Sequence, residues 1–186
     1  SHTYLFAGMN ETTRKDSVMS YDPLSNSTTL MTARFPSPRI GTSGGWDGTN
    51  AYIFGGYNGT AYLTEIVKYT ISTDSLEVMS STLPYGLAGS SAVWNGESFY
   101  IFGGRTGPTF HDQILRYSPA TGTVNTQSSV LPGVRYHTSA VWFQGSAYVF
   151  GGRNDTGTLD EIVRFTPETN AVELLSIRLP SHREYT

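Results

Sequence analysis

The strongest constraint on the fold of this chain is an internal repeat. The 186-residue sequence matches itself without gaps when it is shifted by 48 residues, the separation between Tyr4 and Tyr52. Four successive registers share aromatic, glycine and proline columns, which are Tyr4, Tyr52, Tyr100 and Tyr148; Phe6, Phe54, Phe102 and Phe150; Gly8, Gly56, Gly104 and Gly152; and Pro36, Pro84, Pro132 and Pro180. Such a period indicates a repeat array, in which each unit buries its apolar faces by stacking on its neighbours.

Each register has the pattern of four short antiparallel strands. In the third register, Asn95-Gly96 is suited to a two-residue hairpin turn, and Gly103-Gly104 ends the apolar segment that follows it. We therefore expect strands over residues 90–94, 98–102, 113–117 and 123–128. Repetition of this four-strand pattern predicts an all-β fold, in which the units stack radially as a β-propeller of four-stranded antiparallel blades. The small residues over 42–45, 90–92 and 138–140 suit innermost strands, because blades crowd at the axis.

Several motifs resemble kelch repeats over essentially the whole chain. They are PR-x-x-x-S-x-x-W from Pro38 to Trp46, with its counterpart from Arg135 to Trp142, the segment Y-[IV]-F-G-G, and a [VI]-x-[KR]-Y strand before a turn. One departure is the column that carries a Trp in kelch repeats, which here reads Thr28, Leu76, Val124 and Val172. The resemblance implies a kelch-like propeller related in architecture to the galactose oxidase type.

The chain is expected to form a single propeller segment over residues 1–186, with registers of about 1–41, 42–89, 90–137 and 138–186. Ser1 aligns with Gly145, so the first register lacks an inner strand, and Thr186 aligns with Thr138, where another inner strand would begin. Kelch-like propellers usually have more blades than four. We therefore expect an incomplete propeller that is completed by further chain or by a neighbouring copy, with unpaired strand edges available for self-association.

Composition excludes several functional classes. The net charge is −3 without a basic block, which argues against nucleic-acid binding, and no apolar run is long enough for membrane insertion. The chain contains no cysteine, which excludes disulfides, thiolate nucleophiles and cysteine-based zinc sites. It also excludes the kelch-like copper radical oxidases, whose cofactor requires a Tyr–Cys cross-link. We expect no cofactor.

No motif indicates catalysis or metal binding. The histidines at positions 2, 111, 137 and 182 lack the spacing of a metal-binding helix. Asp160 and Glu161 are adjacent, but neighbouring strand residues point to opposite faces, so a structural role is favoured over an acid–base pair. The chain is therefore expected not to be an enzyme, and no catalytic or metal-ligating residue is predicted.

One column of arginines suggests a ligand site. Arg39, Arg135 and Arg183 each precede an inner strand, and the second register has Leu87 at that position. The kelch resemblance implies that this column lines a pocket at one mouth of the channel, where Tyr85, Tyr136, Tyr185 and His137 would add contacts. Guanidinium groups suit carboxylates or acidic peptides. The alternative is that these arginines bond backbone carbonyls and join neighbouring blades.

Asn-x-Ser/Thr sequences recur in the predicted loops. Asn10, Asn58 and Asn154 share one column after the double glycine, and Asn26 lies in another turn. They are either N-glycosylation sites of an extracellular or cell-surface protein or simply good turn residues. A cytoplasmic location is the alternative.

These features favour a non-enzymatic extracellular recognition or scaffold module with a protein or glycan partner. A second possibility is a repeat unit that assembles head to tail into an oligomer or glycosylated filament. A third is a carbohydrate-active kelch-propeller enzyme, for which no catalytic set is visible.

Overall fold

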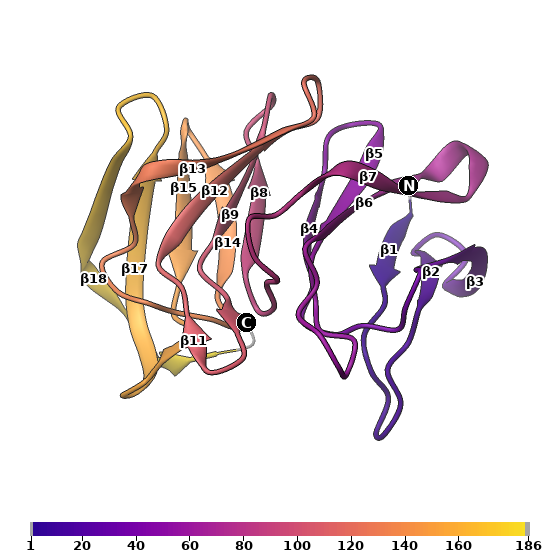
Figure 1. The fold of residues 1–186 in the computed structure, drawn as a ribbon, viewed down its shortest axis with the longest axis horizontal. Helices are drawn as coiled ribbons and strands as arrows, with labels where there is room; N and C mark the ends of the chain where they lie inside the picture. The colour runs from indigo at the N-terminus through magenta and orange to yellow at the C-terminus, as the bar shows by residue number, and fades with distance from the viewer. Residues whose placement is uncertain (1, 185–186) are drawn as a thin grey trace.

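The computed structural model describes residues 2–184 and is an all-β protein with four antiparallel sheets arranged as the blades of a β-propeller (Figure 1). The predicted fold class is thereby confirmed. The only helical element among the described residues is a 3-10 turn at Ile71–Thr73. No helix in residues 2–184 is long and apolar enough to cross a membrane.

We number the blades 1 to 4 in chain order. Blade 1 contains β1 (Thr3–Phe6), β2 (Ser17–Asp22) and β3 (Ser27–Arg34). Blade 2 contains β4 (Ser43–Trp46), β5 (Asn50–Phe54), β6 (Glu65–Thr70) and β7 (Ser75–Thr82). Blade 3 contains β8 (Ser91–Trp94), β9 (Phe99–Phe102), β12 (Gln113–Ser118) and β13 (Thr123–Val130). Blade 4 contains β14 (Ser139–Phe143), β15 (Ser146–Phe150), β17 (Gly157–Thr166) and β18 (Ala171–Arg183).

The loops after two of the double glycines contain further short strands. β10 (Arg105–Thr106) pairs with β11 (Thr109–Phe110), and β16 (Arg153–Asn154) pairs with the start of β17. The sequence pattern predicted only loops there, because two-residue strands leave no periodic signal.

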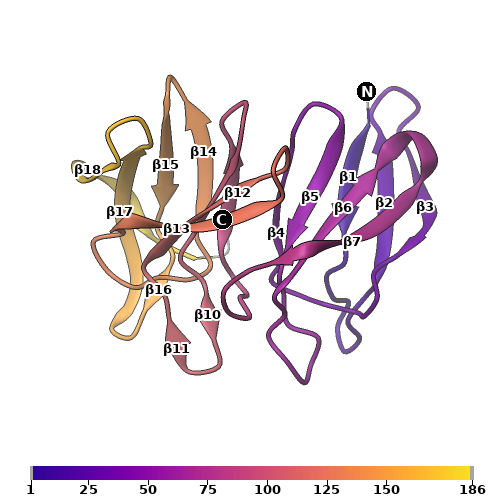
Figure 2. The same cartoon turned by 45° about the horizontal axis from the view of Figure 1, so that its top comes forward.

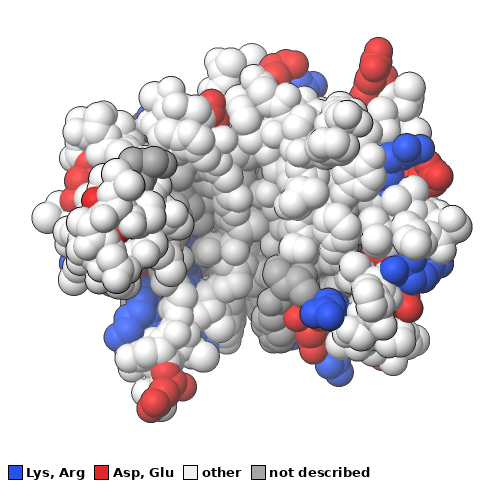
Figure 3. Space-filling view, turned by 180° about the vertical axis from the view of Figure 1, so that it is seen from behind, with Lys and Arg blue, Asp and Glu red and all other residues white. Residues whose placement is uncertain are grey.

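The blades lie side by side in chain order, with blades 1 and 4 at opposite ends of the long axis (Figures 1 and 2). Neighbouring inner strands are joined by hydroxyl pairs, Ser43 Oγ to Ser90 Oγ at 2.9 Å and Ser91 Oγ to Thr138 Oγ1 at 2.8 Å. Charged side chains lie mainly toward the periphery of the face seen in Figure 3, around an uncharged centre.

The apolar core is divided into three clusters, one at each blade–blade interface. Between blades 2 and 3, the ring of Phe54 meets Phe99 and Tyr117 edge to face, with centroid distances of 5.4 and 5.9 Å. All four residues of β9 are buried because blades pack on both of its faces. This explains why that strand is almost uninterruptedly apolar.

The double glycines connect each blade to the following segment. The first glycine has a positive φ, 59° at Gly55 and 59° at Gly103, and a Cβ at Gly55 would collide with the carbonyl oxygen of Leu87. The N–H of the second glycine, Gly56, donates to that same carbonyl at 2.8 Å. Glycine adopts the left-handed backbone without strain and leaves room for this close approach.

Blade 1 departs from this rule because Ala7 stands where the other blades have glycine. Ala7 has φ of 56°, so it holds the left-handed conformation with a side chain present. A left-handed non-glycine residue costs about 1–2 kcal/mol.

We predict that Ala7→Gly raises the free energy of unfolding by about 1 kcal/mol, because relief of this strain exceeds the extra chain entropy of glycine. Urea titration followed by tryptophan fluorescence measures it. Ala51→Gly, in the buried part of β5, is the control and is expected to destabilise the protein. An A7G variant no more stable than the parent would contradict the assignment of strain to residue 7.

Candidate functional site

The loops that follow the double glycines gather at one end of the blades, the lower end in Figures 1 and 2. We call this end the mouth. The arginine column lies here, because the N–H groups of Gly8, Gly104 and Gly152 donate to the carbonyls of Arg39, Arg135 and Arg183.

The guanidinium groups of Arg39 and Arg135 are buried in ion pairs. Their side chains are 0% and 1% exposed, and each Nη2 donates to a glutamate, Arg39 to Glu65 at 2.6 Å and Arg135 to Glu161 at 2.7 Å. Nε of each donates to the carbonyl two residues before it, at 3.2 Å. This geometry favours the structural interpretation of the column, since neither guanidinium faces an open surface.

Residue pairing across the repeat explains why the arginines differ between blades. The glutamate column reads Ser17, Glu65, Gln113 and Glu161. Glutamate is therefore present where the arginine column has Arg39 or Arg135, and glutamine where it has Leu87. The arginine and glutamate columns therefore change together from repeat to repeat, and this is the sequence signal by which the buried ion pairs could have been predicted.

The other predicted mouth residues differ in exposure. Arg183 is exposed, and Tyr136 is buried. Tyr85 stacks on His111 with a centroid distance of 4.2 Å, and burial raises the pKa of Tyr85 to about 12. Burial likewise lowers the pKa of His111, although Gln113 and Asp112 oppose this shift. The neighbouring Tyr185 belonged to the same prediction and lies outside the described residues.

A stack of arginine and aromatic side chains, not predicted from the sequence, crosses the mouth from blade to blade. The guanidinium of Arg105 lies 5.7 Å from the ring centre of Tyr62 and 5.4 Å from that of Tyr136. Nε and Nη2 of Arg105 donate to the Tyr62 hydroxyl at 3.0 and 2.7 Å. Tyr62 in turn packs against Tyr57, over which Arg14 lies at 5.2 Å.

This stack borders a cavity of about 450 Å³. Arg105, Tyr57, Tyr62 and His137 supply its polar and aromatic wall, and Met9 and Ile40 are among its apolar lining. A cavity with one cation and several aromatic faces is suited to binding an anionic group or a sugar.

An ionic cluster lies beside this cavity. Glu184 approaches Arg153 at 3.3 Å and His137 Nδ1 at 3.6 Å. Burial lowers the pKa of His137, and Glu184 opposes this shift. His137 also has φ of 54°, a strained backbone that holds its ring against Tyr136 at 4.3 Å.

The sequon asparagines of the mouth loops act as turn residues. Asn58 Oδ1 accepts hydrogen bonds from the N–H groups of Thr60 and Ala61, and Asn154 Oδ1 from those of Thr156 and Gly157. Asn10 Oδ1 accepts one from Thr13. Asn26 lies away from these loops, between β2 and β3, and accepts a hydrogen bond from Tyr21.

Two further observations bear on chemistry. Within residues 2–184, no group of three or more His, Asp or Glu side chains is placed to hold a metal ion.

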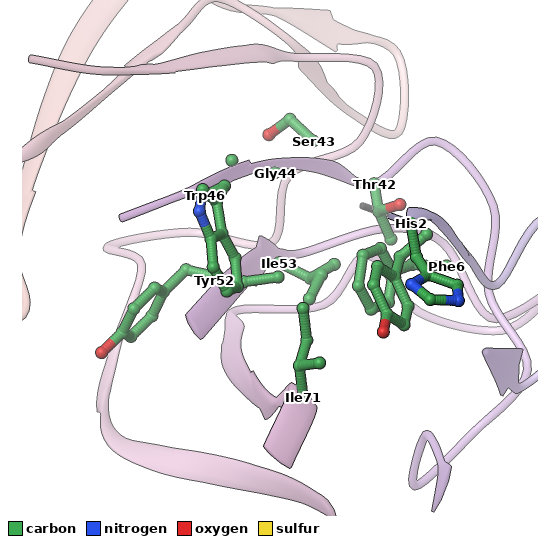
Figure 4. Close-up of a pocket in the computed structure, with 12 residues that line it drawn as sticks. His2, Phe6, Thr42, Ser43, Gly44, Trp46, Tyr52, Ile53 and Ile71 are labelled. Atoms are coloured by element: carbon green, nitrogen blue, oxygen red, sulfur yellow. The ribbon is translucent and has the colours of Figure 1, made fainter. Parts of the chain in front are cut away.

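A second and larger cavity, of about 760 Å³, lies between blades 1 and 2 (Figure 4). It is lined by β1, β4 and β5 and lacks the predicted site residues.

We predict that Arg39→Ala lowers the free energy of unfolding by about 3 kcal/mol, because it leaves the partly buried Glu65 carboxylate without its cation. The double variant Arg39→Leu, Glu65→Gln copies the Leu87 and Gln113 combination of blade 3 and is expected to retain most of the stability. Chemical denaturation measures both variants. If both variants lost the same free energy of unfolding, the stability would come from the ion pair itself, and the unpaired Glu65 charge would not account for the loss in Arg39→Ala.

Comparison with models of known protein families finds no match to this chain, and comparison with curated proteins finds none either.

Proposed function

We propose that this chain is a kelch-like propeller segment that acts as a non-enzymatic recognition module, binding an anionic group of a protein or glycan partner at the mouth. The kelch assignment is supported by the double glycines and by the [VI]-x-[KR]-Y motifs, which fall in β6, β12 and, with Phe for Tyr, β17. The observation that carries the function is the placement of Arg105 between Tyr62 and Tyr136 on a cavity wall.

The surroundings of Arg105 suit it to recognition. Two aromatic rings and the Tyr62 hydroxyl hold the guanidinium in one orientation, so little side-chain entropy is lost when an anion binds. Partial burial weakens solvent screening and strengthens the attraction to a carboxylate. Tyr57 and Tyr62 add flat apolar faces for the rest of a ligand.

An Arg105→Ala variant should lose most of its affinity for carboxylates at the mouth. The probe is a fluorescent array of glutamate-containing decapeptides, each matched by a peptide with glutamine for glutamate. We expect carboxylate-dependent binding to fall at least tenfold in R105A and by less in Arg105→Lys. Arg116→Ala, on β12 and bonded to Ser98 and Glu97, is the control and should bind as the parent does.

Binding that is equal for glutamate and glutamine peptides, or unchanged in R105A, would refute the anion site.

We also propose that the module is extracellular and glycosylated, supported by the three sequons on mouth loops. Glycans at Asn10, Asn58 and Asn154 would surround the cavity and favour a small or extended ligand over a broad protein surface. Mass spectrometry of protein secreted from eukaryotic cells, before and after N-glycosidase treatment, tests this. Unmodified asparagine at all three positions would count against it.

A second candidate function, head-to-tail assembly, is favoured by the apolar end faces. Leu5 and Leu30 of blade 1 are 55% and 58% exposed, and Phe143 of blade 4 is 57% exposed. The equivalents of Leu5 in the other blades, Ile53, Ile101 and Val149, are buried at blade interfaces. The exposed face of blade 1 in one copy would thus pack against the exposed face of blade 4 in another copy, in the way that consecutive blades pack within one chain.

Analytical ultracentrifugation tests the assembly. Leu5→Glu and Phe143→Asp should each reduce association, because each places a charge in the end-face contact. A parent chain that sediments as a monomer over the micromolar range would exclude this candidate.

A further inference from the structure

His137 occupies a strained backbone position at which the two preceding repeats have glycine. The column reads Gly41, Gly89 and His137, and the three residues have φ values of 66°, 70° and 54°. Glycine adopts this left-handed conformation freely, whereas a residue with a side chain adopts it at a cost. Strained residues of this kind cluster at functional sites. The histidine therefore points to a role for its ring.

The ring of His137 lies over bare backbone on the wall of the mouth cavity. The N–H of His137 donates to the carbonyl of Gly89 at 2.6 Å, and the N–H of Gly89 donates to that of Gly41 at 2.7 Å. A Cβ at Gly89 would lie 2.7 Å from Cδ2 and 3.2 Å from Nε2 of the ring, so glycine leaves the room that the ring occupies. His137 and Arg105 line the same cavity of about 450 Å³.

Charged groups act on His137 from several elements. Glu184 Oε2 lies 3.6 Å from Nδ1, and Arg153 on β16 pairs with the same carboxylate. Arg105 on β10 lies 5.4 Å from the ring centre of Tyr136, which is 4.3 Å from that of His137. Burial lowers the pKa of His137, Glu184 opposes this shift, and the positive charges of Arg105 and Arg153 add to it. In the ligand-free protein the ring is therefore mainly neutral at pH 7.

An anion bound at Arg105 would reverse this balance. Its negative charge offsets the charge of Arg105, which is one of the causes that keep His137 neutral. The carboxylate of Glu184 only accepts hydrogen bonds, so Nδ1 carries the proton of the neutral ring and the second proton goes to Nε2. Because coupled binding equilibria are reciprocal, an anion that promotes protonation of His137 is itself bound more tightly by the protonated protein.

We propose that protonated His137 is the second cationic contact for an anion bound at Arg105, so that binding at the mouth takes up a proton. This inference rests on the function proposed above and adds a residue that sets when the site binds. The affinity for an anion should rise as the pH falls from 8 to 6, the range in which histidine titrates. Each unit by which the anion raises the pKa of His137 corresponds to a tenfold gain in affinity.

The probe is the glutamate decapeptide that the parent chain binds most tightly, measured by isothermal titration calorimetry at pH 6 and pH 8. We expect binding about threefold to tenfold tighter at pH 6, with a heat that depends on the buffer because a proton is taken up. His137→Asn tolerates the positive φ but does not titrate, so it should bind equally at both pH values. His182→Asn is the control. His182 pairs with Asp160 on β17, and its variant should keep the pH dependence of the parent.

A second measurement needs no ligand. The ring C–H signal of His137 in NMR spectra should titrate at a higher pH in Arg105→Gln than in the parent, because the neighbouring positive charge is removed. Equal titration midpoints, equal parent affinity at pH 6 and pH 8, or pH dependence that persists in H137N would each overturn the inference and leave the Arg105 site standing. Absence of peptide binding at both pH values would instead refute the proposed function, and this inference with it.

Discussion

The contact between each double glycine and a carbonyl of the following segment is the constraint on which the rest of the structure depends. The first glycine of a pair comes so close to that carbonyl that a side chain would collide with it, and the second donates its N–H to the same oxygen. The hydrogen bond of the second glycine recurs in each blade, including blade 1, where Gly8 follows Ala7, and it sets the blade against the segment that follows. The aromatic interfaces, such as Phe54 on Phe99 and Tyr117, then pack in the same way each time.

The same contact determines the chemistry of the mouth. The residue after the double glycine enters a loop at the mouth, and its identity is free to vary because the glycines have already fixed the backbone. In blade 3 this residue is Arg105, which reaches Tyr62 from blade 2 and Tyr136 from the segment that enters blade 4. A repeated scaffold thus brings together residues that differ from repeat to repeat. This combination supports a binding role at the mouth.

Much of the fold could be predicted from the sequence, and less of the site. The repeat identified the strands, the blades and the small inner strands, because backbone geometry repeats whenever glycine, proline and aromatic columns repeat. The arginine column was found, but its burial was not, since that depends on Glu65 and Glu161, on neighbouring strands. Arg105 was missed because its column reads Met9, Tyr57, Arg105 and Arg153 and shows no period.

The sequence by itself determined the all-β repeat, the blade pattern and the absence of cysteine chemistry. Only the tertiary structure decided which arginines are buried ion-pair partners and which lies on a cavity wall. It also placed between blades 1 and 2 a cavity whose lining has no Asp, Glu, Lys or Arg side chain. The physical reason is that strand formation depends on local periodicity, whereas burial and ligand access depend on side chains that different blades bring together in space.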